Sequence, residues 1–184
     1  MNRKIFFDEY RKTLDPDKSI SNQEVKDIDL FLSFFENDYG MFSIKQWAYV
    51  FATVYHETGA TFHPVRESPR ASEDWRKRNF RYFPYYGRGY VQITWDYNYK
   101  TYSKKLGIDL LKNPDLAMKP EYSWFILVDG FKYGVFTGRK ISQYINEKGA
   151  DYVNARRCIN GTDKAQLIAS YAKTFEIILN KMIV

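Results

Sequence analysis

The chain has 184 residues, which is long enough to bury a sizeable core. Its composition, 45% hydrophobic and 27% charged, is typical of a globular protein. Lys and Arg outnumber Asp and Glu by 28 to 22, and the resulting formal charge of +6 favours approach to polyanions, but no recognition-helix, zinc-finger or RNA-binding signature accompanies it. The only cysteine, Cys158, excludes an internal disulfide framework, and the longest wholly apolar run near the middle, residues 124–128, is far too short to cross a bilayer.

Two helices are predicted in the first third of the chain. The run Ser21-Asn22-Gln23-Glu24 has the form of a capping box, and apolar residues then recur at helical spacing, which predicts a helix over residues 21–36. A second capping pattern, Ser43-Ile44-Lys45-Gln46, is followed by an apolar stripe. We therefore expect a second helix whose C-terminus lies near Glu57.

Residues 58–87 lose this periodicity. Gly59 and three prolines break any regular element, so the sequence predicts long loops with a short helix around residues 72–78. Loops of this length in a compact domain are usually functional or disordered, and the high aromatic content of this segment argues against disorder.

Helical signals return after these loops. Residues 90–94 form either a short strand or the entry to a helix that continues to Leu106. Pro120 suits the first turn of another helix, which we expect to end at Gly138. A short helix is then expected over residues 141–145.

The last helix is predicted from a cap at Asp163 and from apolar residues that keep the helical period as far as Met182. No internal repeat or low-complexity linker is visible, so residues 1–184 are expected to form a single, mainly α-helical domain that acts as a monomer. The first ten residues lack an apolar stretch long enough for a signal peptide, which predicts synthesis without an export signal.

Glu57 and Glu67 are candidates for a pair of catalytic carboxyl groups, the minimum apparatus for cutting a glycosidic bond. On one unbroken helix, ten residues would separate them by about 15 Å, more than the roughly 6.5–9.5 Å between the carboxyl groups of an inverting glycosidase. Gly59 and Pro64 can reverse the chain between them. We expect Glu57, at a helix end among apolar residues, to donate the proton and Glu67, on a polar loop, to activate water. The spacing alone also fits two ordinary surface glutamates.

The two histidines of the chain, His56 and His63, flank Glu57 and invite comparison with zinc sites. The zinc-protease pattern requires its second histidine four positions after the first, where this chain has Ala60, and no cysteine or acidic cluster completes a ligand set. We therefore expect no metal, and we expect His56 to be a packed or hydrogen-bonding residue beside the cleft.

Aromatic and amide side chains of the kind that hold sugars gather in residues 85–99. The polar members, suited to placing a water and to bonding acetamido groups, are Gln92, Thr94 and Asn98. The members with flat faces are Tyr86, Trp95 and Tyr97. Trp95 and Tyr97 fit the hydrophobic core equally well, because Trp and Tyr serve both purposes.

In their order along the chain, these segments resemble glycoside hydrolase family 19, the chitinase-like enzymes. The resemblance rests on four runs: His56-Glu57-Thr58-Gly59, Tyr85-Tyr86-Gly87-Arg88-Gly89-Tyr90-Val91-Gln92-Ile93-Thr94-Trp95-Asp96-Tyr97-Asn98-Tyr99, Asn113-Pro114-Asp115-Leu116 and Ile159-Asn160-Gly161. It covers about residues 47–161. Residues 64–67 and 136–140 look closer to the compact phage and prophage endolysins of this family than to the plant chitinases.

The resemblance implies a lysozyme-like, mostly α-helical fold with two lobes around a cleft, no cofactor, and hydrolysis of β-1,4 bonds next to N-acetylated sugars with inversion. By motif position it implies that Glu57 is the general acid and that Thr94 positions the attacking water. The amides that it implies for substrate binding are Gln92, Asn98 and Asn160. The second acid lies on a shortened loop, where Glu67 is the first choice and Glu73 the fallback.

We therefore predict an endolysin-type hydrolase of bacterial peptidoglycan, since a small, basic chain without disulfides suits an anionic wall. A chitinase is the alternative among enzymes, because both substrates present N-acetylglucosamine in β-1,4 linkage. A non-catalytic amino-sugar-binding module is the alternative outside enzymes, although sugar binding needs no carboxylate pair. An endolysin made in the bacterial host cytoplasm would require a separate pore-forming partner to reach the wall, and neither nucleic acid nor stable membrane insertion is expected.

Overall fold

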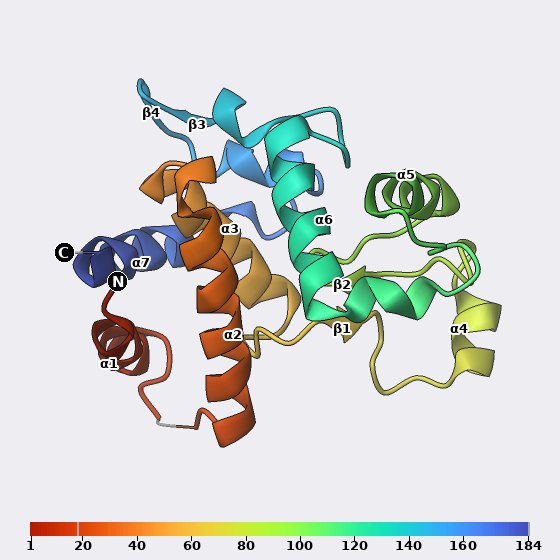
Figure 1. Cartoon of the computed structure of the whole chain (residues 1–184), viewed down its shortest axis with the longest axis horizontal. Coiled ribbons are helices and arrows are strands. Elements are labelled where there is room, and N and C mark those ends of the chain that lie inside the picture. The colour runs from red at the N-terminus through yellow and green to blue at the C-terminus, as the bar shows by residue number, and fades with distance from the viewer. Residues whose placement is uncertain (18, 184) are drawn as a thin grey trace.

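The computed structural model describes residues 1–17 and 19–183. Within this part of the chain, seven α-helices make up most of the structure (Figure 1). In chain order they are α1 (Arg3–Thr13), α2 (Asn22–Asp38), α3 (Ile44–Glu57), α4 (Glu73–Asn79), α5 (Asp96–Leu106), α6 (Pro120–Tyr133) and α7 (Ala165–Ile183). The prediction of a mainly helical fold is confirmed, and the short helix expected around residues 72–78 is α4.

Short 3-10 helices and two-residue strands connect the α-helices. The 3-10 helices are η1 (Tyr39–Met41), η2 (Pro114–Met118), η3 (Ile141–Gln143) and η4 (Asn154–Cys158). The strands form two antiparallel pairs, β1 (Val65–Arg66) with β2 (Arg88–Gly89) and β3 (Ile145–Asn146) with β4 (Gly149–Ala150). In the first pair, Val65 lies opposite Gly89 and Arg66 opposite Arg88, so the loop after α3 is tied to the segment that leads into α5.

The capping patterns in the sequence position α2 and α3. The Ser21 hydroxyl accepts a hydrogen bond from the backbone N–H of Glu24 at 3.2 Å, and the Glu24 carboxylate accepts one from the N–H of Ser21 at 2.7 Å. Ser43 and Gln46 make the same reciprocal pair at 3.4 and 3.0 Å. These bonds satisfy N–H groups that no helical carbonyl can reach. Both helices therefore lie where the sequence predicts them, and α3 ends at Glu57.

Helix α6 ends four residues earlier than predicted, at Gly134 instead of Gly138. Gly134 takes a φ of 72°, and its N–H donates to the carbonyl of Gly130 at 2.9 Å. A Cβ at Gly134 would lie 2.9 Å from the backbone carbon of Arg139, so only glycine fits this turn. Both glycines are suitable helix ends by their chemistry, and the close approach of residue 139 favours the first.

Three other segments differ from the prediction. Helix α1, which the Asn2 side chain caps, has no counterpart among the predicted elements. Residues 141–145 form η3 and the start of β3 instead of a short helix. Residues 90–94 form a turn that is neither strand nor helix, because Gln92 takes a φ of 54°, and α5 begins only at Asp96.

The hydrophobic core is centred on α3, which is buried over most of its length and packs chiefly against α7. Figure 1 shows α1, α2, α3 and α7 gathered near the two termini, with α4 and α5 on the other side of α6 and the β1–β2 pair. The helices thus form two groups. No helix in the described part of the chain is both long enough and apolar enough to span a bilayer.

Candidate active site

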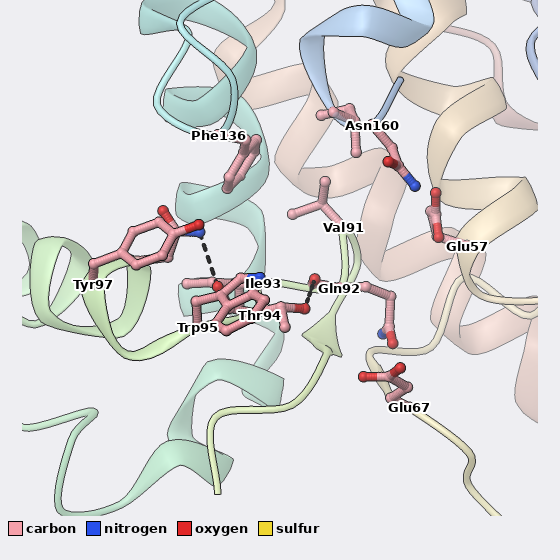
Figure 2. A pocket seen from close by; sticks show the side chains of 12 residues that line it. Glu57, Glu67, Val91, Gln92, Ile93, Thr94, Trp95, Tyr97, Phe136 and Asn160 are labelled. Atoms are coloured by element: carbon pink, nitrogen blue, oxygen red, sulfur yellow. Dashed lines mark hydrogen bonds between the residues drawn. The ribbon is translucent and has the colours of Figure 1, made fainter. Parts of the chain in front are cut away.

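A cleft of about 460 Å³ brings together side chains from both groups of helices (Figure 2). Its lining residues are Glu57, Glu67, Val91, Gln92, Ile93, Thr94, Trp95, Tyr97, Asn98, Phe136, Ile159 and Asn160. Glu57 ends α3, Glu67 follows β1, and residues 91–98 lead from β2 into α5. Phe136 follows α6 and Asn160 follows η4. The cleft therefore exists only in the folded chain, because its walls come from segments far apart in the sequence.

Glu57 is held by a buried arginine. Nη1 of Arg156 donates a hydrogen bond to Oε1 of Glu57 at 2.7 Å, and Nε of Arg156 donates to the backbone carbonyl of Asp163 at 3.0 Å. The Arg156 side chain is 3% exposed and that of Glu57 17% exposed. The sequence predicts apolar surroundings for Glu57, and that prediction is wrong because Arg156 gives it a charged partner, whose hydrogen bond fixes the direction of the carboxyl group. Figure 2 shows this carboxyl group facing the amide of Asn160.

Glu67 is fixed by the residues that surround it in the loop and at β2. Its backbone N–H donates to the carbonyl of Gly87 at 2.7 Å, and its Oε2 accepts a hydrogen bond from the Gly87 N–H at 2.9 Å. Its Oε1 accepts a hydrogen bond from the Tyr82 hydroxyl at 2.7 Å. Each carboxylate oxygen keeps a further lone pair, so the group can still bind water. Figure 2 shows Gln92 between Glu57 and Glu67 on the cleft wall.

The lack of a side chain at Gly87 makes room for this arrangement. A Cβ at Gly87 would lie 2.7 Å from Oε1 of Gln92 and 3.2 Å from Oε2 of Glu67. Any larger residue would therefore push the Gln92 amide away and crowd the carboxylate of Glu67. Glycine at this position leaves space for the Gln92 side chain and lets the Gly87 N–H bond to the Glu67 carboxylate.

Glu73, the fallback for the second acid, lies outside the cleft lining. It is the first residue of α4, and its side chain is 53% exposed. Its Oε1 accepts hydrogen bonds from Nη1 of Arg76 and from the Tyr86 hydroxyl, both at 2.7 Å. The fold thus brings Glu67 into the cleft with Glu57, whereas Glu73 belongs to a surface ion-pair network.

The polar side chains of residues 92–98 help to hold the cleft together. The Thr94 hydroxyl donates to the carbonyl of Gln92 at 2.9 Å, and Nδ2 of Asn98 donates to the carbonyl of Thr94 at 2.9 Å. Nε2 of Gln92 donates to the carbonyls of Val65 and Gly89 at 2.8 and 3.1 Å, which reinforces the β1–β2 pair. The groups left for a ligand are the acceptor lone pairs of the Thr94 hydroxyl, the side-chain oxygens of the two amides and the second N–H of Asn98.

Trp95 and Tyr97 lie at the cleft and not in the core. Both line it, their ring centroids are 6.4 Å apart, and their planes differ by 15°. Tyr97 is 57% exposed. Of the two alternatives left open by the sequence, the structure thus favours the flat surface that a sugar ring can contact.

The prediction that Tyr86 offers a sugar-binding face is wrong. Its ring is fully buried and lies 3.7 Å from the guanidinium carbon of Arg88 and 5.1 Å from that of Arg76. Tyr86 therefore supports the loop from beneath through cation–π contacts and its hydrogen bond to Glu73. His56, expected beside the cleft as a packed or hydrogen-bonding residue and a candidate for substrate binding, is partly exposed and is not among the residues that line the cleft.

The model of glycoside hydrolase family 19, described as chitinase class I, matches residues 18–125, more than half of the chain. The chain belongs to this family. Chitinase 5 of Oryza sativa subsp. japonica is 34% identical to it over 135 residues, 62% of this chain and 46% of the relative. Inactive chitinase-like protein 1 of Hevea brasiliensis is 59% identical over 33 residues, 18% of this chain and 10% of the relative. The crystal structure of a bacterial family 19 chitinase is 26% identical, with a TM-score of 0.61 over 84% of this chain and 85% of that one.

The family resemblance read from the sequence is thereby confirmed, and so is the lysozyme-like helical fold that family 19 chitinases share. This family 19 chain spans less than half the length of the rice relative, 46% of it. The similarity to phage endolysins remains a prediction, because the relatives described above are chitinases or chitinase-like proteins by name.

The sequence does not predict the two residues whose side chains hold the acids of this family 19 site, Arg156 at Glu57 and Tyr82 at Glu67. Arg156 lies 99 residues from Glu57, so no local pattern connects them. Tyr82 lies in an aromatic-rich loop, and the sequence does not indicate which ring of that loop meets Glu67. Burial and, next, the hydrogen bond to Glu67 raise the pKa of Tyr82 to about 12, so its hydroxyl remains a donor at neutral pH.

Two of the family 19 motif runs are joined by an ion pair. Nε of Arg88, from the run Gly87-Arg88-Gly89, donates to Oδ1 of Asp115 at 2.7 Å, and Nη2 of Arg66 donates to Oδ2 of Asp115 at 3.1 Å. Burial by itself would raise the pKa of Asp115, but the hydrogen bonds and charges of the two arginines outweigh burial and lower it. The ion pair ties β2 to η2 and so holds the segment that carries the cleft residues.

Proposed function

We propose that this chain hydrolyses β-1,4 glycosidic bonds next to N-acetylated amino sugars and inverts the anomeric configuration. The observation that carries the proposal is that Glu57 and Glu67, from two separate elements, line one cleft together with Thr94. Two carboxyl groups on one cleft are what an inverting glycosidase requires: one acid for the leaving oxygen and one base for water. Membership of family 19 supports the same chemistry.

In the proposed reaction, Glu57 donates its proton to the oxygen that leaves, and Glu67 takes a proton from the attacking water. The water forms its bond to the anomeric carbon from the face opposite the leaving oxygen, so a β bond yields an α product. Arg156 lies 2.7 Å from Glu57 and places a positive charge beside the carboxylate that remains after proton donation. The Thr94 hydroxyl, which already donates to a backbone carbonyl, would accept a hydrogen bond from the same water and hold it.

The remaining cleft residues suit an amino sugar. Trp95 and Tyr97 offer adjacent, nearly parallel rings. Asn98 is 8% exposed and is held by its hydrogen bond to the Thr94 carbonyl, whereas Asn160 is exposed and lies across the cleft near Glu57 (Figure 2), so the two amides can bond an acetamido group from opposite sides. Polar groups at set places on a cleft wall give direction to the binding of a sugar.

The two candidate substrates, chitin and bacterial peptidoglycan, both contain this bond next to N-acetylglucosamine. The names of the relatives favour chitin as the substrate. The formal net charge of +6 favours the glycan strand of bacterial peptidoglycan, as in an endolysin, since that wall is anionic and chitin is uncharged.

A non-catalytic amino-sugar-binding module is the second candidate, because one relative is described as an inactive chitinase-like protein. Such a module would need the rings and amides of the cleft but neither carboxyl group. Hydrogen bonds that hold both acids in place favour the hydrolase.

The proposal is tested with the purified chain, chito-oligosaccharides and peptide-free glycan strands of peptidoglycan. We expect new reducing ends from at least one of the two, with the α anomer appearing first in time-resolved proton NMR. The sugar at the new reducing end identifies the bond that is cut. Binding of either glycan without any new reducing end would support the binding module and reject the hydrolase.

Replacing Tyr82 by Phe should lower kcat by about tenfold to a hundredfold with little change in KM, because Glu67 loses a charge-assisted hydrogen bond worth about 1.5–3 kcal/mol. The matched control is Tyr85→Phe, since the Tyr85 hydroxyl donates to the Leu111 carbonyl at 3.3 Å and touches neither acid. Steady-state kinetics on the substrate identified above measure both variants. Equal kcat values for Tyr82→Phe and wild type would show that Tyr82 does not position Glu67.

A further inference from the structure

We propose that Arg81 recognises a carboxylate on the sugar bound at the Trp95–Tyr97 surface, so that the cleft prefers a glycan with carboxylated amino sugars over a neutral one. The inference rests on the proposed function and names the substrate class of the same cleft. It concerns a residue that none of the sequence motifs includes.

Arg81 lies against the aromatic surface of the cleft. Its guanidinium carbon is 5.0 Å from the centroid of the Trp95 ring, and the Arg81 side chain is exposed. Trp95 lines the cleft and lies nearly parallel to Tyr97. A guanidinium group held by a cation–π contact keeps its N–H donors directed outward at the edge of the ring. A sugar that contacts these rings would therefore meet the charge of Arg81.

The charge of Arg81 is not neutralised, unlike that of the other arginines that contact rings nearby. Arg76 pairs with Glu73 at 2.7 Å, and Arg88 pairs with Asp115 at 2.7 Å. Within residues 1–17 and 19–183, Arg81 forms no ion pair, although Asp96 follows Trp95 directly in the chain. Arg81 is thus a cation that is in contact with a cleft ring and still available to a ligand.

Arg81 also lies on the wall that carries the proposed base. Tyr82 packs edge-on against Trp95 with ring centroids 5.1 Å apart, and its hydroxyl bonds to Glu67 at 2.7 Å. Burial is the main reason that the pKa of Tyr82 rises to about 12, and the positive charge of the neighbouring Arg81 opposes that rise. A carboxylate at Arg81 would therefore belong to a sugar close to the bond that is cut.

Arginine matches a carboxylate by charge and by geometry, because its planar group offers two parallel N–H donors. A neutral chitin sugar offers these donors only uncharged hydroxyl and acetamido oxygens, and no carboxylate. In peptidoglycan the carboxylate could come from the lactyl group of a sugar that carries no peptide, or from the peptide where one is attached to that group. We assign it to the sugar, since the Trp95–Tyr97 surface holds a ring and Arg81 touches Trp95.

The test compares wild type with Arg81→Gln on three oligosaccharides of equal length. The first is a peptide-free glycan with carboxylated amino sugars, the second is the same glycan with its carboxyl groups reduced to alcohols, and the third is a chito-oligosaccharide. We expect Arg81→Gln to lower kcat/KM on the first about fivefold to tenfold, mainly through KM, and to change the other two less than about twofold. The loss should shrink at high ionic strength, because salt screens an exposed charge pair.

The matched control is Arg70→Gln, which removes the same charge from an exposed position that contacts no cleft ring. Arg70→Gln should leave kcat/KM unchanged on all three oligosaccharides. An equal loss on all three glycans with Arg81→Gln would mean that Arg81 only supports Trp95, and would overturn the inference. A fourth assay on the same glycan with its peptides attached separates the two sources of the carboxylate. A loss confined to those peptide-bearing strands would assign the carboxylate to the peptide and would also overturn the inference.

Failure of the proposed function is distinguishable from failure of this inference. If wild type cuts none of the glycans, the hydrolase proposal falls. Calorimetry with the same three oligosaccharides still decides the role of Arg81. Tighter binding of the carboxylated glycan that disappears in Arg81→Gln supports the inference, and equal dissociation constants for all three in both proteins reject it.

Discussion

Replacing Glu57 by Gln is expected to lower kcat by about a thousandfold, within the range of about 10²–10⁴ that general acid catalysis contributes. The amide has no proton to give at neutral pH, so the leaving oxygen departs without assistance. The substitution keeps the shape of the side chain, and the amide oxygen can still accept the hydrogen bond from Arg156 that Oε1 of Glu57 accepts at 2.7 Å. Release of reducing ends at saturating substrate measures the effect.

The control for this prediction is binding. Because Glu57→Gln leaves Trp95, Tyr97 and the amides in place, its dissociation constant for an uncut oligosaccharide should stay within about threefold of that of wild type. Retained binding with lost turnover would place the defect in the chemical step. A kcat within tenfold of wild type would remove Glu57 as the acid.

Replacing Glu67 by Gln should lower kcat by about a hundredfold or more, whereas Glu73→Gln should change it by less than about threefold. Glu67 lines the cleft with Glu57, and its carboxylate is the group that can take a proton from water there. Glu73 is 53% exposed and bonds to Arg76 on the outside of the cleft. Parallel kinetics of the two variants on one substrate measure the difference.

Glu73→Gln is the matched control because it removes the same charge from the same stretch of chain, six residues along. Both variants should be checked for folding by thermal unfolding, since Oε2 of Glu67 accepts a hydrogen bond from the Gly87 N–H at 2.9 Å that an amide nitrogen cannot accept. The opposite ranking, with Glu73→Gln the slower enzyme, would mean that the wrong acid has been assigned as base.

Local chemistry predicts the helices that carry the site. The capping boxes at Ser21 and Ser43 position α2 and α3 because each requires only two side chains three residues apart. The apolar stripe of α3 then places Glu57 at the end of a buried helix. Interactions of such short range are visible in any single sequence.

The environment of each acid depends on contacts that the sequence does not reveal. Arg156 reaches Glu57 across 99 residues, and the choice of Glu67 over Glu73 depends on how β1 pairs with β2. Tertiary packing also decides the role of each aromatic residue. Tyr86 is buried against Arg88, while Tyr97 is 57% exposed. Tyrosine suits both environments, so residue type alone could not distinguish them.

The sequence by itself determined the helical character of the chain, the N-terminal ends of α2 and α3, and the motifs that assign family 19. These features depend on hydrogen bonds and apolar periods within a few residues of one another. Only the tertiary structure decided that Glu67 shares the cleft with Glu57, that Arg156 holds Glu57, and that Trp95 and Tyr97 face the cleft. The physical reason is that a side chain's partners and exposure are set by which distant segments pack against it, and that packing exists only once the chain has folded.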